Sequence, residues 1–178
     1  ALSVRHLRAA TVGTASAWGV LTLILAWAVP VAQLAELQTL LEAAEPAARR
    51  AILESWGPSL VASFSFLLGF DFLYDVVHNN AAALFVVWGA IQCDTPRARS
   101  VGAMTAWVLW LDTGLNIFEN LAFLHVLRSR SPDPLLPAVA AIFSFRSATL
   151  MLGLLVGAAL HTSAWRARRP TKRWSGPA

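Results

Sequence analysis

Four long apolar runs divide the chain, and each of them is long enough to cross a lipid bilayer. They cover approximately residues 10–34, 59–93, 101–126 and 136–161, and a spanning helix needs about 20 apolar residues. Charged residues make up only 13% of the chain, about half the share typical of soluble domains. The sequence therefore predicts an all-α, polytopic integral membrane protein: a four-transmembrane-helix bundle forming one membrane domain over residues 1–178.

Residues 35–58, between the first two runs, have a different pattern. Leu37 and Leu41 recur at helical spacing among glutamates, and Pro46 suits the first turn of a second short helix. We expect a pair of amphipathic helices lying on the membrane surface. Trp56, at the end of the second one, is predicted to anchor it at the interface.

The second run is longer than a bilayer requires. Its 35 residues, 59–93, would form a helix of ~52 Å, against a hydrocarbon core of ~30 Å. The helix must therefore protrude, tilt strongly or break. The polar triplet at residues 78–80 is the expected place for a kink or partial unwinding.

Basic residues lie at the ends of the runs and predict the orientation of the chain. With four spans both termini share one side, and that side holds more of the arginines and lysines. We therefore expect cytoplasmic termini, a basic cytoplasmic tail at residues 162–178, and a bacterial-type inner or plasma membrane. This placement argues against a nucleic-acid partner, and the single Cys93 excludes a disulfide framework within one chain. The terminal side carries Arg5, Arg8, Arg97, Arg99, Arg166, Arg168, Arg169, Lys172 and Arg173, and the other carries Arg49, Arg50, Arg128 and Arg130.

Two of the apolar runs carry matching sets of polar residues. Within each set the residues are separated by steps of four, three and one, so each set falls within an arc of roughly 100° on a helix. A faint internal repeat or convergence on a helical stripe explains the match. Ionisable groups inside such runs indicate function. The second run contributes Asp71, Asp75, His78 and Asn79, and the third contributes Asp112, Asn116, Glu119 and Asn120.

Depth along the helices predicts that these side chains meet. Four of them, from three runs, lie 14 or 15 residues from the basic ends of their spans, which is ~22 Å; they are His78, Asn79, Asn116 and Arg146. Asp75 and Glu119 lie one turn further out. Four ionised carboxylates with one arginine would leave a charge of −3. Such a site needs protonated carboxyls, a bound cation or an open, wet cavity.

A metal site is one interpretation of these residues. Asp75, His78 and Glu119 offer the mixed oxygen and nitrogen ligands that Zn, Mn or Fe accept, so a divalent metal ion is a candidate cofactor. Oxygen ligands alone would favour Mg, Ca or Na. The sequence contains none of the recognised metal motifs, such as HExxH.

A purely structural network is the competing interpretation. Asparagines are natural hydrogen-bond partners between membrane helices, and Arg146 would neutralise one carboxylate, Asp112 or Asp75. Tyr74 lies beside the stripe, where it could donate a hydrogen bond to a carboxylate or serve in packing alone. Trp107 and Trp110 are turned away from the stripe by helical phase, so we expect them to face lipid or another helix.

The leading hypothesis is a site that binds a cation or a positively charged small ligand, for transport, ion coupling or sensing. Asp75 and Glu119 would be its main ligands. Two alternatives stay open: a membrane-embedded enzyme acting on a lipid or isoprenoid, in which His78 and the acids supply acid–base chemistry, and an accessory subunit with a structural polar network. Membrane lipid and a small polar ligand or cation are the expected partners, and a homo-oligomer is a further possibility.

Overall fold

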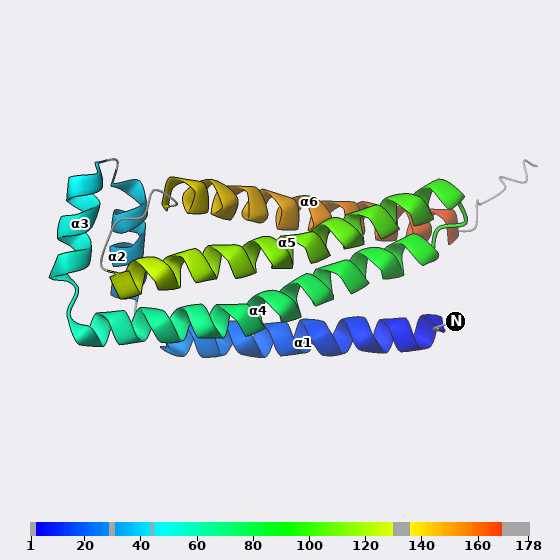
Figure 1. Ribbon diagram of the computed structural model, residues 1–178. Helices are drawn as coiled ribbons and strands as arrows, with labels where there is room; N and C mark the ends of the chain where they lie inside the picture. The colour runs from blue at the N-terminus through cyan, green and yellow to red at the C-terminus, as the bar shows by residue number, and fades with distance from the viewer. Residues whose placement is uncertain (1–2, 29–30, 44, 130–135, 169–178) are drawn as a thin grey trace, which may run out of the picture.

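The chain folds into helices throughout the part that the structure describes. This structure, a computed structural model, describes residues 3–28, 31–43, 45–129 and 136–168. Within these ranges there are six α-helices and no strand (Figure 1). The all-α prediction is therefore confirmed. The helices are α1 (Val4–Ala28), α2 (Val31–Glu42), α3 (Pro46–Ser55), α4 (Pro58–Ile91), α5 (Pro96–Ser129) and α6 (Leu136–Arg168).

Four of the six helices are long and apolar enough to cross a membrane. These are α1, α4, α5 and the part of α6 from Val139 to Arg168. They lie along one long direction, with α2 and α3 across one end (Figure 1). We call that end the cap end, and the other, where the arginines of α1, α5 and α6 gather, the basic end. The predicted four-span architecture is confirmed.

The helix boundaries differ from the predicted spans. The expectation that one helix continues to residue 34 was wrong, because α1 ends at Ala28 and α2 begins at Val31, directly after Pro30 in the sequence. Proline lacks the amide hydrogen that a helix interior needs, and it favours helix starts. At the other end of the chain, α6 continues to Arg168. The remainder of the predicted tail lies outside the described residues.

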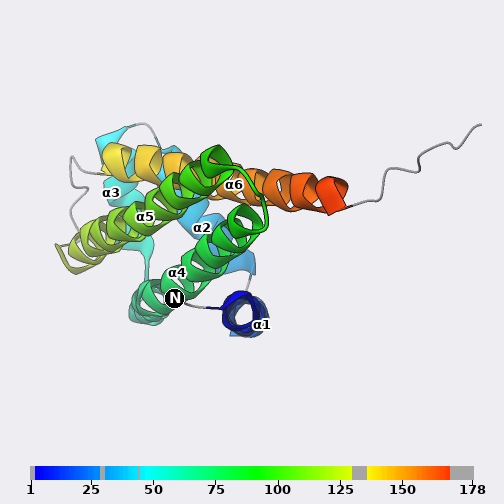
Figure 2. The same ribbon diagram turned by 90° about the vertical axis from the view of Figure 1, so that its right-hand side faces the viewer.

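Helix α4 is central to the packing. It packs against α1, α5 and α6, and α5 and α6 pack against each other, whereas α1 lies on the α4 side of the bundle (Figure 2). Glycines allow the close approach near the basic end. A Cβ atom at Gly102 of α5 would collide with Ala90 of α4, and one at Gly157 of α6 would collide with Phe85. Small residues at such contacts are typical of membrane helix pairs.

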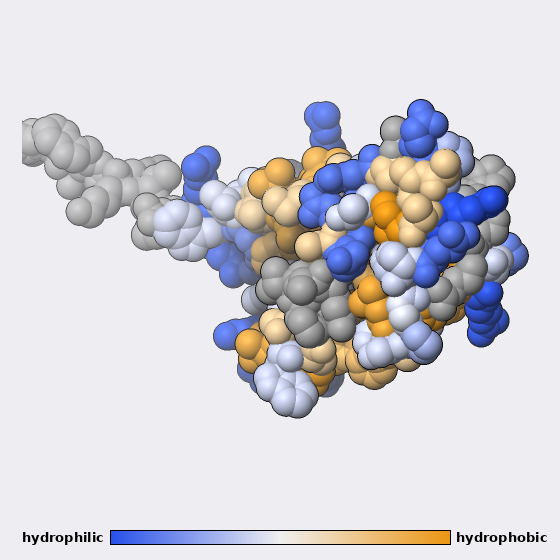
Figure 3. Space-filling view, turned by 90° about the vertical axis from the view of Figure 1, so that its left-hand side faces the viewer, coloured by the Kyte–Doolittle hydropathy of each residue, from blue (hydrophilic) through white to orange (hydrophobic). Residues whose placement is uncertain are grey.

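The cap end has an apolar core of its own. Leu40 of α2, Leu53 of α3 and Phe64 of α4 are buried together with side chains of α5 and α6. Trp56, which directly follows α3, is only 3% exposed and stacks on Phe64 with ring centroids 4.6 Å apart. The prediction of Trp56 as an interfacial anchor was wrong, since α3 turns this ring inward. Hydrophilic side chains cover much of the outer surface of this end (Figure 3).

The long fourth helix is unbroken. The predicted unwinding at residues 78–80 does not occur, although Figure 1 shows the axis of α4 changing direction near its middle. The Asn80 amide donates back to the Val76 carbonyl at 2.7 Å, within the helix. The extra length of α4 extends into the cap, where Leu60, Leu67 and Leu68 pack against its core.

Candidate functional site: the Arg146 cluster

Arg146 of α6 lies at the centre of a buried polar cluster. Its Nη1 atom donates to Glu119 Oε2 at 2.7 Å and to Asn116 Oδ1 at 2.5 Å. Its Nη2 atom donates to Asp75 Oδ1, and its Nε atom lies 3.6 Å from Asp112 Oδ2. The arginine side chain is 12% exposed and the three carboxylate side chains are almost fully buried. One guanidinium therefore joins α4 and α5 to α6.

Asn79 of α4 forms a second junction. Its side-chain nitrogen lies 3.2 Å from Asp75 Oδ2, 3.2 Å from Asp112 Oδ2 and 3.0 Å from Thr113 Oγ1. The amide has two hydrogens for these three acceptors, so one hydrogen is shared or one contact goes unused. Because the two aspartates lie on different helices, Asn79 holds α4 and α5 in register. We call the set Asp75, Asn79, Asp112, Thr113, Asn116, Glu119 and Arg146 the Arg146 cluster.

Asp71 and Asn120 form a separate pair closer to the cap end. Asn120 donates to Asp71 Oδ2 at 3.0 Å, again across α4 and α5. Asn120 is buried, whereas Asp71 is half-buried. Direct hydrogen bonds between α4 and α5 therefore occur at two levels of the polar stripes, from Asn79 to Asp112 and from Asn120 to Asp71.

His78 connects the cluster to α1. Its Nε2 atom lies 3.6 Å from Asp75 Oδ1, and its ring centroid lies 5.2 Å from that of Tyr74 and 6.0 Å from that of Trp18. The Tyr74 hydroxyl accepts a hydrogen bond from Trp18 Nε1 at 2.8 Å and lies 3.3 Å from Thr22 Oγ1. Of the two roles considered for Tyr74, the hydrogen bond to a carboxylate is not formed, because its hydroxyl points toward α1. These aromatic rings separate His78 from the surroundings of the bundle.

Four buried polar atoms of this region have no hydrogen-bond partner among the described residues. They are His78 Nδ1, Asn79 Oδ1, Asp112 Oδ1 and Arg146 Nε. Buried polar atoms in proteins are nearly always paired, and in a membrane interior the penalty for leaving them unpaired is several kcal/mol. Two of the four are acceptors only. The cluster therefore has unused capacity to accept hydrogen bonds or coordinate a positive charge.

The charges of the cluster do not balance. Asp75, Asp112 and Glu119 face a single guanidinium, so three ionised carboxylates would leave a net charge of −2. Including nearby Asp71 makes the excess −3. An uncompensated charge in such a site is strongly unfavourable. Protons, a bound cation or water that reaches the site must supply the balance.

The metal triad expected from the sequence is not assembled. No group of three or more His, Cys, Asp or Glu residues is placed to hold a metal ion within the described ranges. The reason is that Arg146 donates to both Asp75 and Glu119, so a guanidinium lies between the two main proposed ligands. His78 approaches Asp75 but belongs to the α1 side of the site.

Most of the predicted site residues come together, although ligand binding by them stays a prediction. Asp75, Asn79, Asp112, Asn116, Glu119 and Arg146 share the cluster, His78 adjoins it, and Asp71 pairs with Asn120 beside it. Thr113 and Trp18 were missed. Thr113 directly follows Asp112 and could have been included, whereas nothing in the pattern around Trp18 indicates a contact with Tyr74.

A second polar contact lies near the basic end. His161 of α6 stacks on Phe85 with centroids 4.6 Å apart, and its Nε2 atom lies 3.1 Å from the Phe85 carbonyl oxygen. Gln92 lies 3.3 Å from the other ring nitrogen, and Trp88 packs edge-on. Because α6 continues past His161, this residue packs against α4 inside the bundle.

Comparisons of the chain with protein-family models, with curated proteins and with solved structures find no match. The class of protein is therefore defined by the fold and the site alone. It is a membrane-type bundle of long apolar helices with a buried cluster of charged residues.

Proposed function

We propose that the Arg146 cluster binds a small cation, a sodium ion or a proton, and couples its binding to transport or sensing. One observation carries the proposal: the cluster has more carboxylates than cations, and Asp112 Oδ1 and Asn79 Oδ1 are buried acceptors without a partner. Carboxylate and amide oxygens are the ligands that hard cations prefer. The class of ligand follows from this donor set.

Competition with Arg146 would couple cation binding to a change in the protein. Arg146 bonds directly to Asp75 and Glu119, but its Nε atom is 3.6 Å from Asp112. A cation bound to Asp112 and Asn79 would replace the guanidinium in the weakest of the three ion pairs. Asp112 would then attract Arg146 less strongly. A ligand shifts a conformational equilibrium only by its differential affinity for the two states. Here the difference would arise in the contact of α6 with α5.

The first test is the unfolding temperature of detergent-purified protein in sodium chloride and in N-methylglucamine chloride at equal ionic strength. Sodium at about 100 times its dissociation constant would add about 2.7 kcal/mol of stability. The Asp112→Asn variant should lose this sodium-dependent gain. Asp94→Asn should retain it, because Asp94 is exposed and lies in the connection between α4 and α5.

If the ligand is a proton, the same two variants give a different outcome. Sodium then has no effect on the unfolding temperature. Proton uptake on acidification, measured with a pH-sensitive dye, should be smaller in Asp112→Asn than in Asp94→Asn. If neither sodium nor protons distinguish these two variants, the cluster is a structural network and the proposal fails.

A membrane-embedded enzyme acting on a lipid is the second candidate, and His78 favours it. Asp75 lies near Nε2 of this histidine, and Nδ1 is buried without a partner among the described residues, an arrangement suited to a general acid or base. Lipid turnover by the purified protein that is lost in His78→Gln would establish this function instead, if neither sodium nor protons distinguish Asp112→Asn from Asp94→Asn.

We also propose that both termini are cytoplasmic, in a bacterial-type inner or plasma membrane. The exposed Arg5, Arg97 and Arg166 all belong to the basic end, and cytoplasmic ends of membrane helices are enriched in such residues. Labelling with a membrane-impermeant thiol reagent tests it in a Cys93→Ala background. In intact cells Ser3→Cys should be protected, whereas Ser55→Cys, at the exposed end of α3 in the cap, should be labelled.

A further inference from the structure

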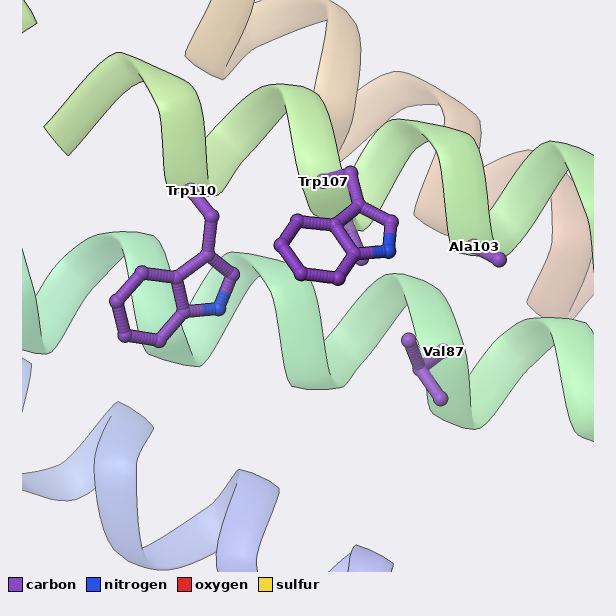
Figure 4. Close-up of a pocket in the computed structure, with 5 residues that line it drawn as sticks. Val87, Ala103, Trp107 and Trp110 are labelled. Atoms are coloured by element: carbon purple, nitrogen blue, oxygen red, sulfur yellow. The ribbon is translucent and has the colours of Figure 1, made fainter. Parts of the chain in front are cut away.

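A shallow apolar groove lies on the outer surface of α4 and α5, away from the Arg146 cluster. Its lining consists of Val87, Ala103, Ala106, Trp107 and Trp110 (Figure 4). Trp107 is 71% exposed and Trp110 is 46% exposed, so these indoles project into the surroundings of the bundle. The small side chains of Ala103 and Ala106 leave the space beside them. At the depth of a membrane span, the surroundings are lipid acyl chains.

Arg99 lies at the basic end of this groove. Residues 99, 103, 106 and 110 are separated by four, three and four positions, which places them on one face of α5. Arg99 is exposed and precedes Ala103 by about one turn, or ~6 Å. Within the described ranges it has no ion-pair partner, whereas Arg146 has several.

The surrounding charge is strongly positive. Three described segments lie near this end, at residues 3–10, 91–100 and 161–168. Asp94 is the one acidic residue within them. Anionic headgroups are attracted to such clusters of basic residues near the membrane surface. The exposed arginines of these three segments are Arg5, Arg8, Arg97, Arg99, Arg166 and Arg168.

We propose that the groove is a binding site for one anionic phospholipid. Its phosphate would pair with Arg99, and one acyl chain would extend along Trp107 and Trp110 toward the middle of the span. Figure 4 shows the indole nitrogens of both tryptophans on the side of each ring nearer Ala103, toward the expected headgroup. Tryptophan suits this position because its large apolar ring can pack along an acyl chain.

The test is native mass spectrometry of the detergent-purified protein with equal amounts of phosphatidylglycerol and phosphatidylcholine that carry the same acyl chains. The wild-type protein should retain phosphatidylglycerol several-fold more than phosphatidylcholine. Arg99→Gln should reduce that preference several-fold. Trp107→Ala should lower the retention of both lipids without changing their ratio.

Arg128→Gln is the matched control, because Arg128 is an exposed arginine at the opposite end of the same helix. It should behave as the wild type. Equal retention of the two lipids by the wild-type protein, or the same preference in Arg99→Gln and Arg128→Gln, would overturn the proposal. Circular dichroism and the elution volume of each variant show that it is folded.

Discussion

Arg146 makes more contacts across helices than any other residue of the site described here. It lies on α6, donates to Asp75 on α4, and donates to Asn116 and Glu119 on α5. A planar guanidinium can serve several acceptors at fixed angles, which an ammonium group cannot do. Its contribution therefore depends on its shape as well as on its charge.

Replacing Arg146 with Gln should strongly destabilise the bundle. The change leaves three buried carboxyls without their cation, and breaking a buried ion pair typically costs about 3–5 kcal/mol. Arg146→Lys should recover part of the loss, because it restores the charge without the two-sided donor geometry. The free energy of unfolding in detergent measures both effects. Wild-type stability of Arg146→Gln would show that the cluster contributes little to folding.

Asn79 supports a prediction that separates its hydrogen bonds from its size. Asn79→Asp keeps the shape, but it removes two donor hydrogens and adds a carboxyl beside Asp75 and Asp112. Asn79→Ala removes the donors without adding charge. We therefore expect Asn79→Asp to unfold at a lower temperature than Asn79→Ala at neutral pH. The reverse order would mean that packing at this position matters more than its charge environment.

The polar stripes could be predicted from the sequence because helical phase determines which residues share a face. The partners of Arg146 could not be assigned fully. The interpretation favoured Asp112 or Asp75, whereas the structure adds a direct bond to Glu119 and leaves Asp112 further away. An arginine side chain reaches across more than a helical turn, so depth along its own helix does not decide which acid it meets.

At the scale of the elements, the two short helices act as a cap on the bundle. Leu40 of α2 and Leu53 of α3 are almost fully buried beneath the outer surface of the cap. The sequence predicted both helices from their periodicity and from Pro46. It did not predict that they cover the bundle end, because a buried face and a lipid-facing one show the same apolar spacing. The inward position of Trp56 was missed for the same reason.

Trp56→Ala should destabilise the cap. It removes a buried ring that stacks on Phe64, and such truncations typically cost about 3–5 kcal/mol. Trp107→Ala removes an equally large ring from an exposed position and should change the unfolding temperature much less. Limited proteolysis at the α2–α3 connection should accelerate only in Trp56→Ala. Equal effects of the two variants would contradict the packing described for the cap.

At the scale of the whole molecule, α4, α5 and α6 form the closely packed unit, and α1 is attached through α4. The four spans were evident from length and hydropathy, but this arrangement was not. Short connections make α4 and α5 neighbours, yet nothing in the apolar surface of α1 specifies its neighbour. The contact depends on details such as the hydrogen bond from Trp18 to Tyr74.

Glycine substitutions on α5 test this packing. Gly102→Ala places a methyl group against Ala90 of α4, and overpacking of this kind costs about 1–3 kcal/mol. Gly114→Ala is the matched control, because a Cβ atom there meets no neighbour and alanine favours helix formation. We expect the unfolding temperature to fall in Gly102→Ala and to hold or rise in Gly114→Ala. A similar response of both would indicate that α4 and α5 do not approach closely at Gly102.

The position of Arg146 on α6 has a consequence for the order of events during synthesis. The ribosome delivers α4 and α5, with Asp75, Asp112 and Glu119, before the helix that carries their counter-charge. Until α6 emerges, these acids must be protonated, stay in water or be shielded by the insertion machinery. A chain that stalls before residue 136 should therefore be removed by quality-control proteases. Escape from degradation would depend on synthesis of the last helix, α6.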